Sequence, residues 1–236
     1  MSDPIGAGVP DEGVDVRQIL AAGRQTFLGV ELLCGPGALV PRAETEILGR
    51  TALEKLRSCP AGVRVIDMCC GAGNLACAIA THLPGAKVWA SDLTDGSVQW
   101  ARRNVEQLGI GDRVMVAQGD LFAGLEGKGL EGTVDAVVCN PPYISTGRLA
   151  GDRTALLETE PREAFDGGPY GLSIHQRVIG DAPRFLRPAG WLLMEFGLGQ
   201  HRQVKILLER SRRFVELGFI SDAAGAPRVA VARLRT

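Results

Sequence analysis

The sequence predicts a doubly wound α/β domain, in which a mostly parallel seven-stranded sheet carries helices on both faces and ends in an antiparallel strand pair. Short apolar runs alternate with stretches of helical periodicity from about residue 44 onward, which is the pattern of βαβ units. Strands that alternate with helices in this way imply a mostly parallel sheet that is covered on both faces. The connection between the last two runs is too short for a crossover helix, so we expect them to pair antiparallel.

The first 48 residues are predicted to be an appendage to this domain. Residues 1–14 combine Gly, Pro and acidic residues, which cannot bury enough surface to offset ordering, so we predict disorder there. Residues 15–48 are predicted to form an N-terminal extension with a short helix and a hairpin. The helix is expected within 16–27, and the hairpin within 28–40, with its turn at Gly35–Gly37. The main domain is then predicted to cover residues 49–236.

From residue 44 the expected elements follow in a regular order, and no internal repeat is present. Thr94 is expected to cap one helix, and Pro84 and Gly85 to close the helix before it. The expected helices cover residues 44–58, 74–83, 94–109, 173–186 and 200–211. The expected strands cover residues 63–68, 87–91, 113–118, 134–139, 190–196, 214–221 and 228–234.

Composition argues against several classes of protein. The net charge is −1, from 26 basic and 27 acidic residues, so sequence-independent binding of nucleic acid is not expected. No apolar run approaches the ~18 residues of a membrane span. The acidic start, broken by Pro and Gly, is not that of a secretory signal. A membrane is therefore not expected as a partner.

The cysteines indicate a reducing compartment rather than a metal site. There are six of them: Cys34, Cys59, Cys69, Cys70, Cys77 and Cys139. They form no C-x-x-C pair, and the three histidines lie far from them in the sequence, so no metal is expected. Most of the cysteines sit among apolar residues, where a thiol behaves as a small hydrophobe. We therefore predict a cytoplasmic location.

A glycine-containing turn after the first strand of the sheet predicts a nucleotide-like pocket. The stretch DMCCGAGNLA places Asp67 at the strand end, and Gly71 and Gly73 in the turn to the next helix. Glycines allow a tight turn and a close approach of ligand to backbone, and the helix start adds free N–H groups. Asp92 ends the next strand, where an acid can bind ribose hydroxyls. Asp120 follows the third strand, where it can accept from an adenine amino group.

Two ligands compete for this pocket. The spacing Gly71-x-Gly73-x-x-Ala76 also fits the fingerprint for a dinucleotide such as NAD. Asp67 argues against NAD, because a pyrophosphate passing there would be repelled, whereas a sulfonium ligand with an ammonium group would be attracted. The ordered acids and the Asn-Pro-Pro-Tyr sequence after the fourth strand favour S-adenosylmethionine, with S-adenosylhomocysteine as the product. The remaining alternative is a set of unrelated strand-end acids and turns.

The sequence Asn140-Pro141-Pro142-Tyr143 predicts the acceptor site. A planar nitrogen is a poor nucleophile because its lone pair is delocalised. The Asn140 side-chain oxygen and the Pro141 carbonyl can accept from its two N–H groups and turn the lone pair toward a methyl group. The prolines stiffen the loop, and Tyr143 offers a flat face for a planar group. Methyl transfer of this kind depends on positioning and electrostatics. The alternative is a Pro-Pro turn that only ends a strand.

These motifs resemble those of a known family, the protein-(glutamine-N5) methyltransferases that modify peptide chain release factors. The resemblance covers about residues 27–234. It includes LVPRAETE, DMCCGAGNLA, GDLF, VCNPPYI, ETEPREAFDGGPYGL, LRPAGWLLMEFGLGQ and the closing D-x-x-G-x-x-R of Asp222, Gly225 and Arg228. PRAETE together with EP…GG…GL is far more specific than Asn-Pro-Pro-Tyr, which also occurs in adenine and cytosine amino methyltransferases. The family implies a class I, Rossmann-like methyltransferase domain and N-methylation of a protein glutamine.

The resemblance also implies roles for individual residues. Cofactor contacts are implied for Asp67, Cys69, Cys70, Gly71, Ala72, Gly73, Asp92, Leu121 and Asn140, and we add Asp120 from the physical argument above. Acceptor contacts and catalysis are implied for Asn140, Pro141, Pro142 and Tyr143, with Arg42, Glu44 and Thr45 shaping the site from the N-terminal side. Alternatively, Arg42 and Glu44 only pair with each other near the surface.

The sequence departs from the family pattern in two places. Cys69 stands where the wider methyltransferase pattern prefers glycine, and a small residue is expected to fit there. The usual N-terminal helical domain, which helps to dock the release factor, has no counterpart, so a helper protein in its place is a further hypothesis. The runner-up function keeps the chemistry but uses a small-molecule acceptor from a biosynthetic pathway. Methylation of a nucleic-acid base lacks the basic surface it needs, and non-enzymatic cofactor binding does not explain an intact Asn-Pro-Pro-Tyr loop.

Overall fold

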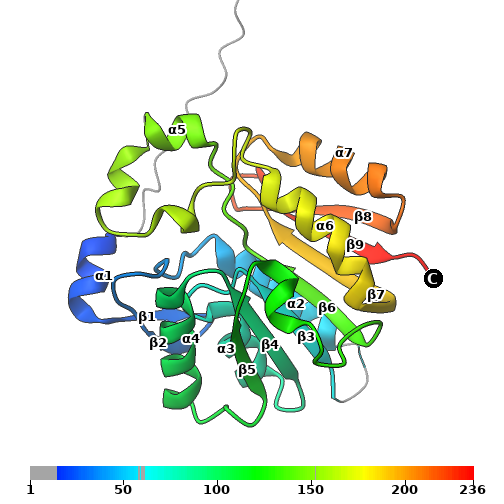
Figure 1. Ribbon diagram of the computed structural model, residues 1–236, viewed down its shortest axis with the longest axis horizontal. Helices are drawn as coiled ribbons and strands as arrows, with labels where there is room; N and C mark the ends of the chain where they lie inside the picture. The colour runs from blue at the N-terminus through cyan, green and yellow to red at the C-terminus, as the bar shows by residue number, and fades with distance from the viewer. Residues whose placement is uncertain (1–14, 58, 60–61, 152) are drawn as a thin grey trace, which may run out of the picture.

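The computed structural model describes residues 15–57, 59, 62–151 and 153–236, so the predicted disorder of residues 1–14 lies outside it. At its centre is a seven-stranded sheet with the order β5-β4-β3-β6-β7-β9-β8 (Figure 1). The strands are β3 (Arg64–Met68), β4 (Lys87–Asp92), β5 (Val114–Gln118), β6 (Val134–Cys139), β7 (Leu186–Glu195), β8 (Phe214–Ser221) and β9 (Pro227–Leu234). Neighbours from β5 to β7 are parallel, whereas β9 pairs antiparallel with both β7 and β8. The predicted doubly wound sheet with an antiparallel end is confirmed.

Helices cover both faces of this sheet, and each face has its own apolar core. On one face lie α2 (Thr45–Arg57), α3 (Asn74–His82) and α4 (Asp95–Gln107). On the other face lie α6 (Ser173–Phe185), α7 (His201–Ser211) and the short η1 (Leu121–Leu125). Figure 1 shows α6 and α7, in yellow and orange, lying next to each other on the same side. The predicted cap is confirmed, because the Thr94 side chain accepts from the Ser97 backbone N–H at the start of α4.

The chain before α2 contains α1 (Val16–Ala22) and a two-stranded hairpin of β1 (Arg24–Phe27) and β2 (Val30–Leu33). The predicted hairpin turn at Gly35–Gly37 is wrong, because the turn lies at Leu28 and Gly29. Both of these residues have positive φ, 49° and 79°, which matches the twist of two-residue hairpins. The expected helix also ends earlier, at Gly23 in the left-handed conformation. The predicted domain boundary at residues 48/49 falls inside α2.

The loop at Gly35–Gly37 packs on α4 instead of reversing the chain. A Cβ on Gly35 would lie 2.0 Å from the Trp100 ring, and Trp100 Nε1 donates to the Pro36 carbonyl at 3.0 Å. A Cβ on Gly96 of α4 would lie 2.5 Å from the Gly37 carbonyl oxygen. The glycines of this loop therefore allow close packing against α4, which brings the following segment to the carboxyl ends of the strands.

A segment for which the sequence predicted no element runs from β6 to α6. It contains α5 (Thr146–Ala150), η2 (Thr154–Glu158) and η3 (Arg162–Ala164). Figure 1 shows it reaching away from the sheet toward α1, and an exposed ion pair at 2.7 Å joins Arg17 of α1 to Glu158. Among the residues that the structure describes, no helix is both long and apolar enough to cross a membrane.

Candidate active site

A cavity of about 270 Å³ opens at the carboxyl ends of the parallel strands. Seven of the residues predicted for the site line it: Cys69, Gly71, Asp92, Asp120, Leu121, Asn140 and Pro142. The segment Pro161–Ala164, which contains η3, and Asp166 also line it, and the sequence analysis did not assign a role to them. A recess of about 20 Å³ lies next to the cavity and adds Asp67, Thr45, Cys70 and Asn74 to the lining. The strand ends therefore bring most of the predicted residues together.

The turn after β3 has a left-handed backbone at three positions, Cys69, Gly71 and Gly73, with φ values of 58°, 54° and 82°. A Cβ on Gly71 would meet no atom within 4 Å, so a side chain there would project into open space beside the cavity. A Cβ on Gly73 would lie 3.2 Å from Ala101, so this glycine allows α3 and α4 to approach closely. Because left-handed backbone favours glycine, the φ of Cys69 explains why glycine is preferred there. Cys70 and Ala72 are buried behind the turn.

Asp67 is fully buried at the end of β3, behind the glycine turn. Its Oδ2 accepts from the Ala76 backbone N–H at 2.9 Å, while Oδ1 has no hydrogen-bond partner. Burial raises the pKa of Asp67 to about 8, and the nearby Asp92 contributes to this rise. The Oδ1 of Asn74, which lines the same recess, is also buried without a partner. The recess thus holds two polar oxygens without a partner, and a cationic donor that entered it would favour the ionised form of Asp67.

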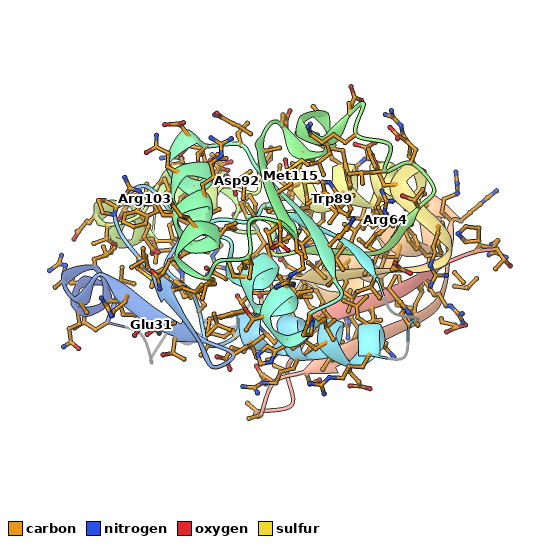
Figure 2. The ribbon with its side chains drawn as sticks, turned by 90° about the horizontal axis from the view of Figure 1, so that it is seen from below. Glu31, Arg64, Trp89, Asp92, Arg103 and Met115 are labelled. Atoms are coloured by element: carbon orange, nitrogen blue, oxygen red, sulfur yellow. The ribbon has the colours of Figure 1, made fainter. Side chains whose placement is uncertain are left out.

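Asp92 ends β4 and is held by backbone groups on both sides. Its Oδ2 accepts from the Gly71 N–H at 2.9 Å, and its Oδ1 accepts from the Thr94 N–H at 3.1 Å. Figure 2 shows Asp92 next to the helix that carries Arg103, which is α4. Burial raises the pKa of Asp92, against hydrogen bonds that lower it. Asp92 thus fixes the glycine turn against the start of α4 and lines the cavity with the same side chain.

Asp120 and Leu121 follow β5 at the outer edge of the cavity. Asp120 is more than half exposed and forms an ion pair with Arg177 of α6 at 2.8 Å. Leu121 is buried, has a left-handed φ of 53°, and its carbonyl accepts from the Ser91 hydroxyl at 3.0 Å. A non-glycine residue in this conformation is strained, and such strain gathers at functional sites. Arg177, which the sequence analysis did not single out, is therefore a partner of the predicted adenine-binding acid.

Asn140 comes directly after β6 and lies between the cavity and the recess. Its Nδ2 donates to the Thr45 hydroxyl at 2.9 Å, which fixes the orientation of the amide. In the described part of the chain, no hydrogen bond is made to the Asn140 Oδ1 or to the Pro141 carbonyl. The Asn140 Oδ1 and the Pro141 carbonyl oxygen belong to adjacent residues of a stiff backbone. Both can therefore accept a hydrogen bond from a donor that enters the cavity.

The loop after Asn140 is held in place by glycines and by one glutamine. A Cβ on Gly171 would lie 2.3 Å from the Tyr143 carbonyl oxygen, and a Cβ on Gly197 would lie 3.0 Å from the Tyr143 ring. A Cβ on Gly167 would lie 2.7 Å from the Pro142 carbonyl oxygen. Gln200 donates to the Tyr143 carbonyl at 2.9 Å and accepts from the Gly197 N–H at 2.8 Å. The segment Asn140–Tyr143 is the acceptor loop, and the motifs GGPYGL and FGLGQ therefore support its backbone.

Arg42, predicted to shape the site, is buried rather than near the surface, which contradicts the surface-pair alternative. Its Nη2 forms an ion pair with the buried Glu160, and Glu160 also accepts from the Val40 N–H at 2.8 Å. Glu160 immediately precedes Pro161, the first residue of the cavity-lining segment 161–164. This pair joins the PRAETE segment to the segment between β6 and α6. Glu44 is partly buried next to Thr45, whose hydroxyl holds Asn140.

A buried polar cluster that the sequence motifs did not indicate lies next to Tyr143. It contains Glu195 at the end of β7 and Arg228 of β9, both of which are buried. The Tyr143 hydroxyl donates to Glu195 Oε1 at 3.3 Å, and His175 Nε2 donates to the Glu195 carbonyl at 2.9 Å. A signal for Glu195 was present in the sequence, because an acid that ends an apolar strand had already singled out Asp67 and Asp92.

The described part of the chain offers no cluster of metal ligands. No group of three or more His, Cys, Asp or Glu side chains that could hold a metal ion occurs among the described residues. The six cysteines are free thiols. Burial raises the pKa of Cys70 and of Cys139, so these two thiols are protonated near neutral pH.

The chain is similar to known proteins along most of its length. A family model for the methyltransferase small domain matches residues 45–158. The release factor glutamine methyltransferase of Gloeobacter violaceus is 36% identical over 221 residues, which cover 94% of this chain and 75% of that protein. The ribosomal protein uL3 glutamine methyltransferase of Bradyrhizobium diazoefficiens is 40% identical over 137 residues, which cover 58% of this chain and 41% of that protein.

A solved structure of a glutamine methyltransferase is also similar to this chain. The crystal structure of the protein-(glutamine-N5) methyltransferase (release factor-specific) from Alicyclobacillus acidocaldarius is 28% identical, with a TM-score of 0.51. The match covers 86% of this chain and 99% of that one. The strand order, the glycine turn after β3 and the asparagine loop after β6 thus define a methyltransferase of the class I fold. More narrowly, the chain belongs to the family of release factor glutamine methyltransferases.

Proposed function

We propose that this protein transfers a methyl group from S-adenosylmethionine to the side-chain nitrogen of a glutamine in a peptide chain release factor. The observation that carries the proposal is the orientation of Asn140, whose amide nitrogen is tied to Thr45 at 2.9 Å, so that its oxygen is left for the cavity. The oxygen and the adjacent Pro141 carbonyl match the two N–H groups of a primary amide. Sequence similarity to release factor glutamine methyltransferases supports the same acceptor.

The residues of the cavity fit the proposed cofactor in three respects. The unpartnered Oδ1 of Asp67, in the recess next to the cavity, suits the ammonium group of a methionine moiety. Gly71 leaves open space beside the turn, so ligand atoms can approach its backbone. Asp92 suits the ribose hydroxyls, and Asp120 with Leu121 suits the adenine. When bound, S-adenosylmethionine supplies a methyl group on a positively charged sulfur, which makes the carbon electrophilic.

The acceptor loop supplies positioning rather than a strong base. Asn140 Oδ1 and the Pro141 carbonyl accept the two amide N–H groups, which holds the nitrogen with its lone pair toward the cofactor side. The Tyr143 ring provides a flat surface for the amide plane. The amide nitrogen would gain the methyl group as the carbon–sulfur bond of the cofactor breaks, the electron pair of that bond would stay on sulfur as a neutral thioether, and one amide proton would pass to water. Pro161–Ala164 lines the same cavity and helps to exclude water from it.

A protein acceptor is supported by two exposed apolar side chains that flank the acceptor loop. Tyr170 is 85% exposed and Leu198 is 46% exposed. Each precedes or follows a glycine that packs directly on Tyr143: Gly171 on its carbonyl and Gly197 on its ring. Exposed tyrosines are common anchor residues at interfaces with a polypeptide.

The proposal is tested with purified protein, S-adenosylmethionine and three acceptors. These are an intact release factor, its Gly-Gly-Gln peptide and free glutamine. We expect one added methyl group by mass spectrometry on the glutamine of the release factor, with a lower kcat/KM for the peptide and less still for glutamine. Absence of methylation on release factor and peptide would overturn the proposal. Activity on a small amide alone would favour the small-molecule alternative.

The same assay also tests the helper-protein hypothesis and, with a fourth acceptor, a second protein substrate. A helper protein would be indicated if the release factor is methylated in a cell extract but not by purified protein alone. Ribosomal protein uL3 is included as a competing acceptor, because one similar protein is named for it. A release factor substrate also agrees with the cytoplasmic location that the cysteines predict, since translation factors work there.

A further inference from the structure

We propose that Asn74 is a further cofactor-binding residue, whose side-chain oxygen accepts, together with Asp67 Oδ1, from the ammonium group of the methionine moiety. This inference rests on the proposed function, because it assigns the recess beside the cavity to one end of S-adenosylmethionine. The sequence motifs did not assign a role to Asn74.

Asn74 is the first residue of α3, and its side chain is buried. Only 8% of the residue is exposed, and in the described part of the chain its Oδ1 has no hydrogen-bond partner. The residue that caps α3 is Gly73, so Asn74 lies one position too late to act as the cap. A buried acceptor without a partner lowers stability. The contacts within the fold therefore do not account for an amide at this position.

The recess that Asn74 lines has room for one small polar group. Its volume is about 20 Å³, and roughly 10–15 Å³ is enough for one water molecule, which is similar in size to an ammonium group. The recess shares Cys69, Gly71 and Asn140 with the lining of the cavity. It therefore suits the small end group of a ligand whose larger part lies in the cavity.

The lining of the recess favours an end group that donates hydrogen bonds. Among the described residues that line it, Asp67 is the only acid and none is basic. Asp67 Oδ2 accepts from the Ala76 N–H at 2.9 Å, which leaves Oδ1. The Asn140 amide nitrogen donates to Thr45, so it does not serve the recess.

The two oxygens left in the recess distinguish between the two ends of an amino acid. A primary ammonium group has three N–H donors, so it can donate to both Asp67 Oδ1 and Asn74 Oδ1. An incoming carboxylate would face these two oxygens without a proton to donate. The amino group of the methionine moiety, and not its carboxylate, is therefore the group that the recess accepts.

The test measures, by calorimetry on the full chain, the binding of S-adenosylhomocysteine and of its deaminated analogue, which carries hydrogen in place of the amino group. For Asn74→Ala, we expect the Kd of S-adenosylhomocysteine to rise about 10- to 30-fold, as for loss of a hydrogen bond to a charged group. The Kd of the deaminated analogue should change less than about twofold. Gln107→Ala replaces an exposed amide at the end of α4, outside both linings, and should leave both Kd values unchanged.

A structural role of Asn74 would give a different pattern. If Asn74 only shaped the turn, Asn74→Ala would weaken both ligands equally, and that result would overturn the proposal. A Kd of S-adenosylhomocysteine within about twofold of wild type would also overturn it. Because alanine removes a buried oxygen that has no partner, the melting temperature of the ligand-free variant should equal or exceed that of wild type.

Asn74→Asp is the second variant, because it keeps an accepting oxygen at the same place. Its preference for S-adenosylhomocysteine over the deaminated analogue should be at least that of wild type, and a loss of this preference as large as in Asn74→Ala would contradict the proposal.

These binding measurements do not depend on turnover, so they separate the inference from the proposed function. If the release factor is methylated but Asn74→Ala keeps the full preference for the amino group, the inference fails and the proposed function stands. If Asn74→Ala loses that preference but no acceptor is methylated, only the proposed function fails.

Discussion

The two sides of the candidate active site are built in different ways. The donor side, formed by Asp67, the turn Cys69–Gly73 and Asp92, comes from two neighbouring strands, and its side chains are held mainly by backbone N–H groups. The acceptor side, formed by Asn140–Tyr143, is held by side chains from distant parts of the chain. Thr45 lies 95 positions from Asn140 in the sequence, and Gln200 lies 57 positions from Tyr143.

This difference has a physical consequence. A carboxylate that accepts from backbone N–H groups keeps its position as long as the strands and helix starts are formed. A loop that depends on side-chain partners can lose its geometry while the fold persists. We therefore expect changes on the acceptor side to affect kcat, and changes on the donor side to affect cofactor affinity and stability.

The largest effect is expected for Asn140→Ala, which removes one of the two acceptors for the amide. kcat should fall about 100- to 1,000-fold, because a preorganised polar group of this kind contributes about that much to a rate. Cofactor Kd, measured by calorimetry, should change less than about threefold. Gln118→Ala is a matched control, since Gln118 is an exposed amide at the end of β5 that does not line the cavity. Equal loss of kcat and cofactor binding would show that the two sides are not separable.

The next largest effect is expected for Asp67→Asn, on the donor side. Asparagine can still accept from the Ala76 N–H, but it cannot offer a negative charge to a cationic group in the recess. Cofactor Kd should rise about 10- to 100-fold, as for loss of a hydrogen bond to a charged group. At saturating cofactor, kcat should stay within about threefold of wild type. A lower kcat with unchanged Kd would assign Asp67 to the acceptor side instead.

The same substitution should change how stability depends on pH. The pKa of Asp67 is 3.8 in the unfolded chain and about 8 in the folded protein, so the folded state binds the proton more tightly. Proton binding to Asp67 therefore stabilises the folded state. This contribution is complete below pH 3.8 and is lost as the pH rises through about 8. The free energy of unfolding of ligand-free wild type should therefore decrease over this range. Chemical denaturation at several pH values should show a smaller decrease for Asp67→Asn, and an identical slope would contradict the assignment.

A smaller effect is expected for Tyr170→Ala, which tests the surface around the acceptor side. If Tyr170 anchors a polypeptide, KM for an intact release factor should rise about tenfold, while kcat for a short peptide stays unchanged. Ile220→Ala is a control with another exposed apolar side chain, located on β8 and outside the residues that line the cavity. Equal KM values for wild type and Tyr170→Ala would leave Leu198 and its loop as the region to examine for docking.

The same contrast explains what the sequence could predict. Asp67, Gly71, Gly73 and Asp92 were identifiable because each lies at a strand end within a short motif, and parallel strands bring their carboxyl ends together. Tertiary contacts place the other residues of the site, and a local sequence motif does not reveal such contacts. Arg42 pairs with Glu160 over 118 positions, which no local pattern indicates.

The hairpin turn was misplaced for a related reason. Gly35–Gly37 has the composition of a turn, but its glycines serve close packing on α4. The actual turn includes Leu28, a residue type that does not favour positive φ. The paired strands on either side hold it, and so do two side chains: Glu46 accepts from its N–H at 2.8 Å and the His82 ring donates to its carbonyl at 2.8 Å. Composition alone does not separate these two uses of glycine.

The smallest effect is expected for Cys69→Gly, and it is the sharpest test of the claim that backbone shape defines the donor side. Cys69 has a φ of 58°, so glycine relieves strain in the folded state, but it also gives the unfolded chain more freedom. These contributions oppose each other, and the free energy of unfolding should change by less than ~1 kcal/mol. Cofactor Kd should stay within about threefold, because the turn keeps its conformation without the thiol. Leu121→Gly has a similar φ of 53° but loses a buried side chain, so it should be clearly less stable. If Cys69→Gly weakens cofactor binding as much as Asp67→Asn does, the thiol itself contacts the ligand, and backbone conformation is not sufficient to build this side of the site.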